Sequence, residues 1–187
     1  MALASSIWYL SLHSMRYIFI LCLTLILFVS CKKENTTPIG NAPKVEIYLL
    51  ESFTVNIDQA TNPAALTIAD AVLTETPLVA DQDITYYSKS TTTFKLTKDI
   101  KPIILNYKGD KAFAVTVDKQ PVYFGRFHPA YLSSITFGMA TIDPIFFHNG
   151  ELRINFATIE GNANFQLLDK RNDDLITNAF RSSGRLR

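Results

Sequence analysis

The chain has 187 residues and a mass of 21.0 kDa, a size that fits one modest domain and a short targeting segment. Lys and Arg number 18 and Asp and Glu 17, so the net charge is only +1. A protein that binds nucleic acid through its phosphates carries a basic surplus, so this composition predicts no nucleic-acid partner. With 48% hydrophobic residues, the chain is also too apolar to be disordered throughout.

The N-terminal region carries a long apolar run. Residues 17–30 contain no charged side chain and follow Arg16. This run is too short for a comfortable transmembrane helix, whereas it matches the apolar core of a secretory signal peptide. We therefore expect residues 1–30 to be a signal peptide, with Met15 as an alternative start. The competing interpretation is a membrane anchor that is not cleaved.

The end of this run resembles the lipobox of bacterial lipoproteins. The residues are Leu27-Phe28-Val29-Ser30-Cys31, with Phe28 where leucine is commonest. The resemblance implies cleavage before Cys31 and attachment of lipid to that residue. The following Cys31-Lys32-Lys33-Glu34 is similar to envelope lipoproteins of Bacteroidota-type bacteria. Residues 31–43 would then be a lipidated cysteine and a flexible polar tether, and the membrane would be a partner through the lipid.

Residues 44–187 are expected to form one envelope domain, and its first half reads mainly as strands. Residues 45–53 alternate as a strand does. Residues 64–75 fit either a short helix or a loop followed by a strand. Two further strands are expected at residues 83–87 and 91–97. Residues 98–107 have apolar side chains at helical spacing, with Pro102 tolerable only in the first turn and Asp99 in the N-cap region.

The second half contains the strongest hairpin pattern. Residues 112–117 and 122–127 read as two strands around a turn at Asp118-Lys119-Gln120, with Gly125 as a candidate bulge. Further strands are expected at residues 134–142 and 152–158, separated by a turn at Asn149-Gly150.

A C-terminal helix is expected between residues 169 and 186. Asp169 or Asn172 would cap it, and Gly184 would end it. Together these elements predict an α+β fold, a mostly antiparallel sheet with one or two helices packed on one face and a helix near the C-terminus.

Residues 76–186 weakly resemble the periplasmic head domain of the SecD translocation subunit. Three segments carry the resemblance, at residues 80–84, 112–122 and 175–186, although Lys119 stands where that family has a turn glycine. The resemblance implies a head-like fold and contact with exported polypeptides. It supplies no residue-specific binding motif, so it transfers function only by analogy of fold.

Residues with catalytic chemistry are scarce. The histidines His13, His128 and His148 do not have metal-ligand spacing, and the chain contains neither a Gly-x-Ser-x-Gly elbow nor a glycine-rich phosphate loop. Cleavage before Cys31 would remove Cys22, leaving no free thiol. The sequence therefore predicts a protein that is not an enzyme and that holds no cofactor and no metal.

Aromatic side chains are concentrated between residues 123 and 147. They either fill a core that lacks tryptophan and disulfides, or form an exposed patch that binds a ligand. In the second case the candidate ligand-binding residues are Tyr123, Phe127, His128 and Tyr131.

The sequence favours a lipid-anchored, non-catalytic binding or scaffold module of the bacterial cell envelope, on the periplasmic face or the cell surface. Its expected partners are envelope or exported polypeptides. The alternative is a surface lipoprotein that binds carbohydrate or a small nutrient, which would need exposed rings. A hydrolase would need a pocket that joins His128 or His148 to a carboxylate.

Overall fold

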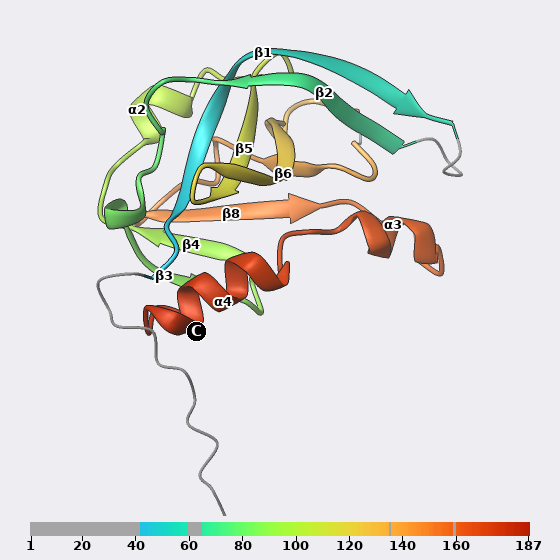
Figure 1. Ribbon diagram of the computed structural model, residues 1–187. Helices are drawn as coiled ribbons and strands as arrows, with labels where there is room; N and C mark the ends of the chain where they lie inside the picture. The colour runs from blue at the N-terminus through green and yellow to red at the C-terminus, as the bar shows by residue number, and fades with distance from the viewer. Residues whose placement is uncertain (1–41, 60–64, 135, 159) are drawn as a thin grey trace, which may run out of the picture. The chain divides into compact units, whose positions relative to one another are not determined.

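The computed structural model describes residues 42–59, 65–134, 136–158 and 160–187 (Figure 1). The predicted signal peptide, Cys31 and the tether as far as residue 41 lie outside the described residues. The described ranges contain strands β1 (Val45–Asp58), β2 (Ala65–Leu73), β3 (Ile84–Ser88), β4 (Thr93–Leu96), β5 (Ala112–Val117), β6 (Gln120–Phe127), β7 (Ala140–Ile142) and β8 (Glu151–Phe156), and helices α2 (Lys101–Ile104), α3 (Ala163–Leu168) and α4 (Asp174–Ser182).

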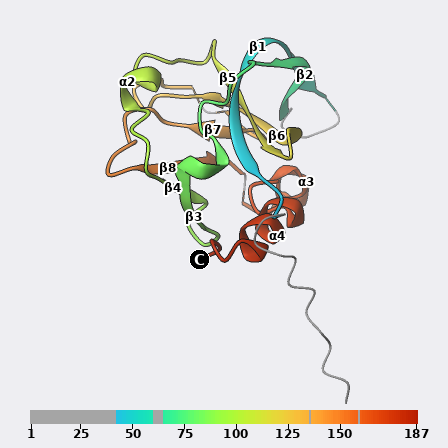
Figure 2. The ribbon, with the colours of Figure 1, turned by 60° about the vertical axis from the view of Figure 1, so that its left-hand side comes forward.

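The strands form one eight-stranded sheet in the order β2-β1-β5-β6-β7-β8-β4-β3. Every neighbouring pair is antiparallel except β6 and β7, which are parallel. Helix α4 contributes to the core, whereas α2 lies at the opposite end of the described part from α4 (Figures 1 and 2). The predicted α+β class, with a mostly antiparallel sheet and a helix near the C-terminus, is confirmed.

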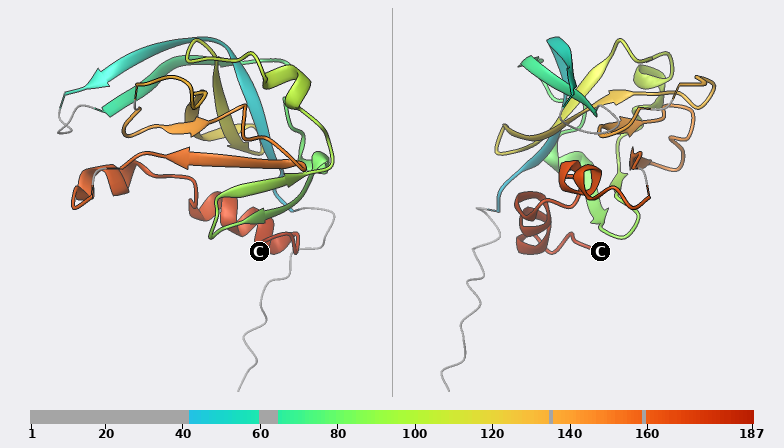
Figure 3. Two further views of the ribbon diagram at one scale, coloured as in Figure 1. Left: turned by 180° about the vertical axis from the view of Figure 1, so that it is seen from behind. Right: turned by 90° about the vertical axis from the view of Figure 1, so that its right-hand side faces the viewer.

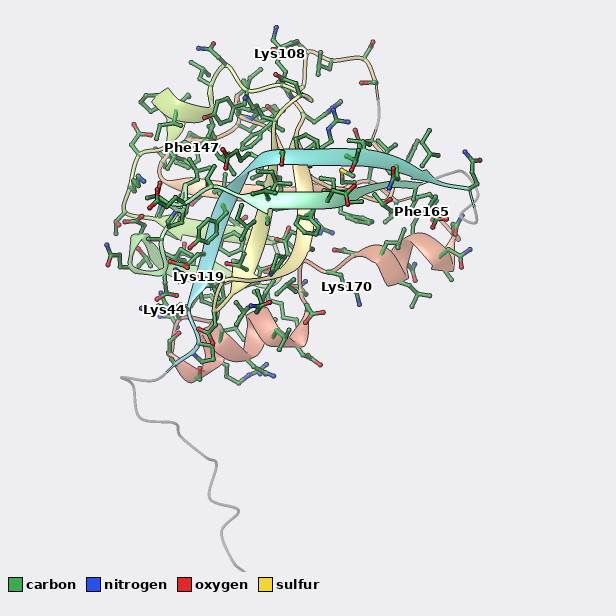
Figure 4. The ribbon with its side chains drawn as sticks, turned by 45° about the horizontal axis from the view of Figure 1, so that its top comes forward. Lys44, Lys108, Lys119, Phe147, Phe165 and Lys170 are labelled. Atoms are coloured by element: carbon green, nitrogen blue, oxygen red, sulfur yellow. The ribbon has the colours of Figure 1, made fainter. Side chains whose placement is uncertain are left out.

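The predicted hairpin is present as β5 and β6. Asp118 and Lys119 both have positive φ, 49° and 65°, as the tight two-residue turns of hairpins require. This turn lies beside the start of β1, where the Lys44 backbone N–H donates to the Asp118 carboxylate at 2.9 Å. Lys44 and Lys119 therefore lie at the same end of the domain (Figure 4).

Gly125 does not form the predicted bulge. The irregularity in the hairpin lies between Val115 and Thr116, and Gly125 stands in register opposite Phe113. A Cβ atom at Gly125 would lie 2.3 Å from the Phe113 ring and 2.5 Å from the Ala140 carbonyl oxygen. Glycine is needed here because β5 and β7 approach β6 closely, and not because the backbone turns.

Several element bounds differ from the prediction. Residues 64–75 take the strand alternative, because β2 pairs with the distal half of β1. The helix expected over residues 98–107 is limited to α2, with Pro102 in its first turn as predicted and Ile100 at the N-cap position. The strand expected at residues 134–142 is limited to β7, because the preceding backbone turns at Gly138, where φ is +72°. Helix α3 was not predicted.

The C-terminal helix begins and ends at local signals in its sequence. The side chain of Asp173 accepts a hydrogen bond from the Leu175 backbone N–H at 3.0 Å, so Asp173 is the N-cap in place of the predicted Asp169 or Asn172. Gly184, with φ of +70°, follows the helix as predicted. Within the helix, Ile176, Ala179 and Phe180 are buried in the core.

The segment between α3 and α4 is fixed by Arg171. Its guanidinium donates to both carboxylate oxygens of Asp169, at 2.8 and 2.7 Å, and to the Ile154 carbonyl at 3.0 Å. Burial by itself would raise the pKa of the Asp169 carboxyl, but the hydrogen bonds from Arg171 lower that pKa below its usual value. This pair holds the chain around Lys170 (Figure 4) against the end of β8.

Candidate functional site

A groove of about 940 Å³ lies on the face of β3, β4 and β8 that points away from the core. These three strands run side by side (Figure 3, left). Their side chains alternate between the two faces of the sheet. Tyr87, Phe94 and Leu152 occupy one row on the core side, so the neighbouring rows face outward and form the floor of the groove.

Two rows of outward-facing side chains make this floor. In the first row, Ser88 on β3 pairs with Thr93 on β4, which pairs with Arg153 on β8. In the second row, Lys95 on β4 stands between Tyr86 on β3 and Glu151 on β8, and of these three Tyr86 and Glu151 line the groove. The floor is therefore polar and hydroxyl-rich at one row and charged and aromatic at the next.

The loop between β7 and β8 forms one wall of the groove. The Asp143 carboxylate accepts a hydrogen bond from the Ile145 backbone N–H at 2.9 Å, which fixes the start of the loop. Phe147 anchors the loop in the core, whereas 63% of Phe146 is exposed. His148 Nδ1 donates to the Phe146 carbonyl at 2.7 Å, because a carbonyl oxygen can only accept.

The C-terminal segment forms the opposite edge. Residues 185–187 run beside β3 as a short added strand: Tyr87 N–H donates to the Arg185 carbonyl at 2.9 Å, and Arg187 N–H donates to the Tyr87 carbonyl at 2.8 Å. Leu186 packs against the core, and Arg187 lines the groove.

The charged groups of the groove differ in whether they already have partners. Glu151 lies 3.7 Å from the Lys95 ammonium, and Asp143 accepts the backbone hydrogen bond described above. In the part of the chain that the structure describes, neither Arg153 nor Arg187 forms an ion pair with a carboxylate. Both arginine residues are exposed. The groove therefore presents two cations without an ion-pair partner among the described side chains, together with the carboxylate of Asp143, whose charge a backbone hydrogen bond does not neutralise.

The groove brings His148 together with Asp143 and Glu151, as the hydrolase hypothesis required. However, within the described ranges no hydrogen bond joins a histidine ring to a carboxylate or a hydroxyl group. His128 Nε2 interacts instead with the Ser134 carbonyl, at 2.7 Å. Among these residues the structure therefore forms no direct contact of the kind that joins a catalytic nucleophile to its base.

The residues that the sequence singled out lie elsewhere. Tyr123 is only 7% exposed and Phe127 is fully buried, so both rings belong to the core. Tyr131 is 59% exposed and His128 is half-buried, but neither lines the groove. The Tyr123 hydroxyl is buried without a hydrogen-bond partner among the described residues, and burial raises its pKa well above the usual value.

Sequence reasoning named His148 for the hydrolase hypothesis and included Phe146 and Phe147 in the aromatic segment, but it missed the polar residues of the groove floor. The alternation in β8 of Glu151, Arg153 and Asn155 with buried Leu152 and Ile154 signals a polar outer face. That signal does not reveal that a distant loop and the C-terminal segment enclose this face.

The chain was compared with protein-family models, with curated proteins and with solved structures, and none of these comparisons finds a match. Within the described ranges, no cluster of His, Cys, Asp and Glu side chains could hold a metal ion. Across the same residues, no helix combines the length and the apolar character that crossing a membrane requires.

Proposed function

We propose that this protein is a lipid-anchored, non-catalytic binding module of the bacterial cell envelope that holds another envelope or exported polypeptide. The observation that carries the proposal is the groove over β3, β4 and β8. The apolar run that ends at Cys31 supports the lipid anchor, and the weak resemblance to a translocation head domain agrees with a polypeptide ligand.

An extended polypeptide suits the geometry of this groove. Along β3 and β8, the side chains that face the groove are two residues apart, a spacing of about 6.6 Å. Side chains on one face of an extended peptide have the same spacing. The exposed ring of Phe146 offers apolar contact area, and the hydroxyl and charged groups of the floor offer hydrogen bonds. The carbohydrate alternative needs exposed rings; Tyr123 and Phe127 are buried, whereas Tyr131 and Phe146 are exposed, so it stays the second candidate.

Site-specific photo-crosslinking in intact cells tests the polypeptide ligand. We expect p-benzoylphenylalanine at position 146 to capture one or a few envelope polypeptides, because this side chain lies in the wall of the groove. Position 131 is the matched control, since Tyr131 is an aromatic residue of nearly equal exposure outside the groove. Products would be identified by mass spectrometry.

Two results of this experiment would contradict the proposal. Crosslinked products from position 131 and none from position 146 would show that the polypeptide binds at the segment that contains His128 and Tyr131, and not in the groove. No polypeptide at either position would favour the carbohydrate or small-nutrient alternative, and a glycan array would then be the next measurement.

The lipid anchor is tested separately by Cys31→Ala. The lipid is attached through this cysteine in the lipobox interpretation, so the variant should lose all labelling by a radioactive or clickable fatty acid and should accumulate as the unprocessed precursor. Equal labelling of the variant and the parent protein would overturn the lipobox interpretation. The competing interpretation, a membrane anchor that is not cleaved, would then be favoured.

A further inference from the structure

The hydroxyl-bearing row of the groove continues to Arg187. Residues 185–187 run parallel to β3 with Leu186 opposite Tyr87, so Arg187 stands next to Ser88. The complete row across four adjacent strands is Arg153, Thr93, Ser88 and Arg187. Neighbouring strands are about 4.8 Å apart, which places the backbones of the two arginine residues roughly 14 Å apart. Two long side chains therefore flank a floor of two hydroxyl groups.

The charges of this row are available to a ligand. Arg153 and Arg187 are exposed and form no ion pair with any described carboxylate. Two carboxylates line the same groove: Glu151, on the floor, lies 3.7 Å from the Lys95 ammonium, and Asp143, in the loop of the wall, accepts the Ile145 backbone hydrogen bond. An unpaired cation at each end of a polar row complements an anionic group lying between them.

The hydroxyl groups of the floor are oriented by local hydrogen bonds. Thr91 Oγ1 donates to Ser88 Oγ at 2.8 Å, so the Ser88 hydroxyl keeps its own proton for another acceptor. Its other neighbour, Ser90 Oγ, is 3.4 Å away, at the limit of a hydrogen bond. The Thr93 hydroxyl donates to the Thr91 carbonyl and holds this turn in place.

We propose that the row formed by Arg153, Thr93, Ser88 and Arg187 binds a carboxylate group of the polypeptide held in the groove. The guanidinium groups donate to the carboxylate oxygens in the fork geometry that suits them, and the Ser88 hydroxyl supplies a further donor. Residues of the ligand next to the carboxylate would then contact Tyr86 and Phe146. The inference rests on the proposed polypeptide-binding function and specifies the chemistry that the groove recognises.

Titration of the purified full-length chain with three peptides tests this inference. All three probes are N-acetylated. The first is Ala-Phe-Ala-Ala with a free C-terminal carboxylate, the second is the same peptide as its C-terminal amide, and the third is the C-terminal amide of Ala-Phe-Glu-Ala. Binding is followed by NMR through the Nε–H signals of the arginine side chains. At low salt we expect a carboxylate-bearing peptide to bind at least about threefold more tightly than the uncharged amide, since charged contacts at exposed sites are modest.

Matched variants assign the effect to the row. Arg153→Gln and Arg187→Gln should each remove most of the preference for the carboxylate. Arg181→Gln changes the net charge by the same amount on the exposed face of α4, outside the groove, and should keep the preference. If only the peptide with the free C-terminus binds more tightly, the groove recognises the carboxylate of a chain end. If both charged peptides bind more tightly, the groove also accepts the carboxylate of an acidic side chain.

Two outcomes would overturn the inference: equal affinity for all three peptides, or a preference that survives in both groove variants. These outcomes are separable from failure of the proposed function. Crosslinks from position 146 without a carboxylate preference would refute the carboxylate site alone. An arginine-dependent preference without any crosslinked polypeptide in cells would refute the cellular function and keep the carboxylate site.

Discussion

Gly125→Ala is expected to lower the free energy of unfolding by about 3 kcal/mol, as severe overpacking of a core does. The added Cβ would lie 2.3 Å from the Phe113 ring and 2.5 Å from the Ala140 carbonyl oxygen. The carbonyl group cannot move away easily, because Ala140 belongs to β7, which pairs with strands on both sides. Urea denaturation followed by circular dichroism would measure the loss.

Gly109→Ala is the matched control for this prediction. A Cβ at Gly109 would meet only the end of the Arg126 side chain, at 3.3 Å, and a flexible side chain can move. We expect a change within about 0.5 kcal/mol, as for most surface substitutions. Equal stability of the two variants would show that β5, β6 and β7 are not packed at the distances described here.

The sequence predicted those elements whose signals are local. The β5–β6 hairpin was recognised because two apolar runs flank a polar turn, and the turn at Asn149-Gly150 was recognised from its residues, both of which have positive φ. Along β6, Tyr123, Gly125 and Phe127 are buried, as the alternation of a strand with one face in the core requires. In each case residues close in sequence determine the structure.

Elements that depend on distant partners were predicted less well. Residues 64–75 carry apolar side chains compatible with a helix or a strand, and pairing with β1 decides for the strand. The parallel pairing of β7 with β6 likewise has no local signal. Apolar spacing predicts a helix over residues 98–107, but only Lys101–Ile104 is helical. A single helical turn is enough to bury both Ile100 and Ile104, so the apolar spacing does not determine the length of the helix.

The groove could not be predicted for the same reason. Its polar floor follows from alternation in β3 and β8, but its walls come from residues 143–148 and 185–187. Only the folded sheet brings these segments together. The density of aromatic residues pointed instead to Tyr123 and Phe127, which are buried. The sequence does not distinguish an aromatic residue of the core from one on a binding surface.

Three aromatic rings form the part of the core that joins α4 to the sheet. The Tyr87 and Phe180 rings are stacked with centroids 5.3 Å apart, and Phe94 contacts both, with centroid distances of 4.7 and 6.0 Å. All three side chains are fully buried. The backbone N–H groups of Arg185 and Leu186 donate to the Phe180 carbonyl, so the same residue also positions the C-terminal segment beside β3.

Phe180→Ala is therefore expected to lower the free energy of unfolding by about 3–5 kcal/mol, through lost burial and the cavity left between Tyr87 and Phe94. Leu175→Ala, on the exposed face of the same helix, is the matched control and should change stability by no more than about 0.5 kcal/mol. Hydrogen exchange adds a local test. The Lys89 amide, which donates to the Arg187 carbonyl, should exchange faster in the Phe180 variant, because the segment that forms the groove's edge loses its support. A small stability loss with unchanged exchange at Lys89 would show that α4 does not hold this edge in place.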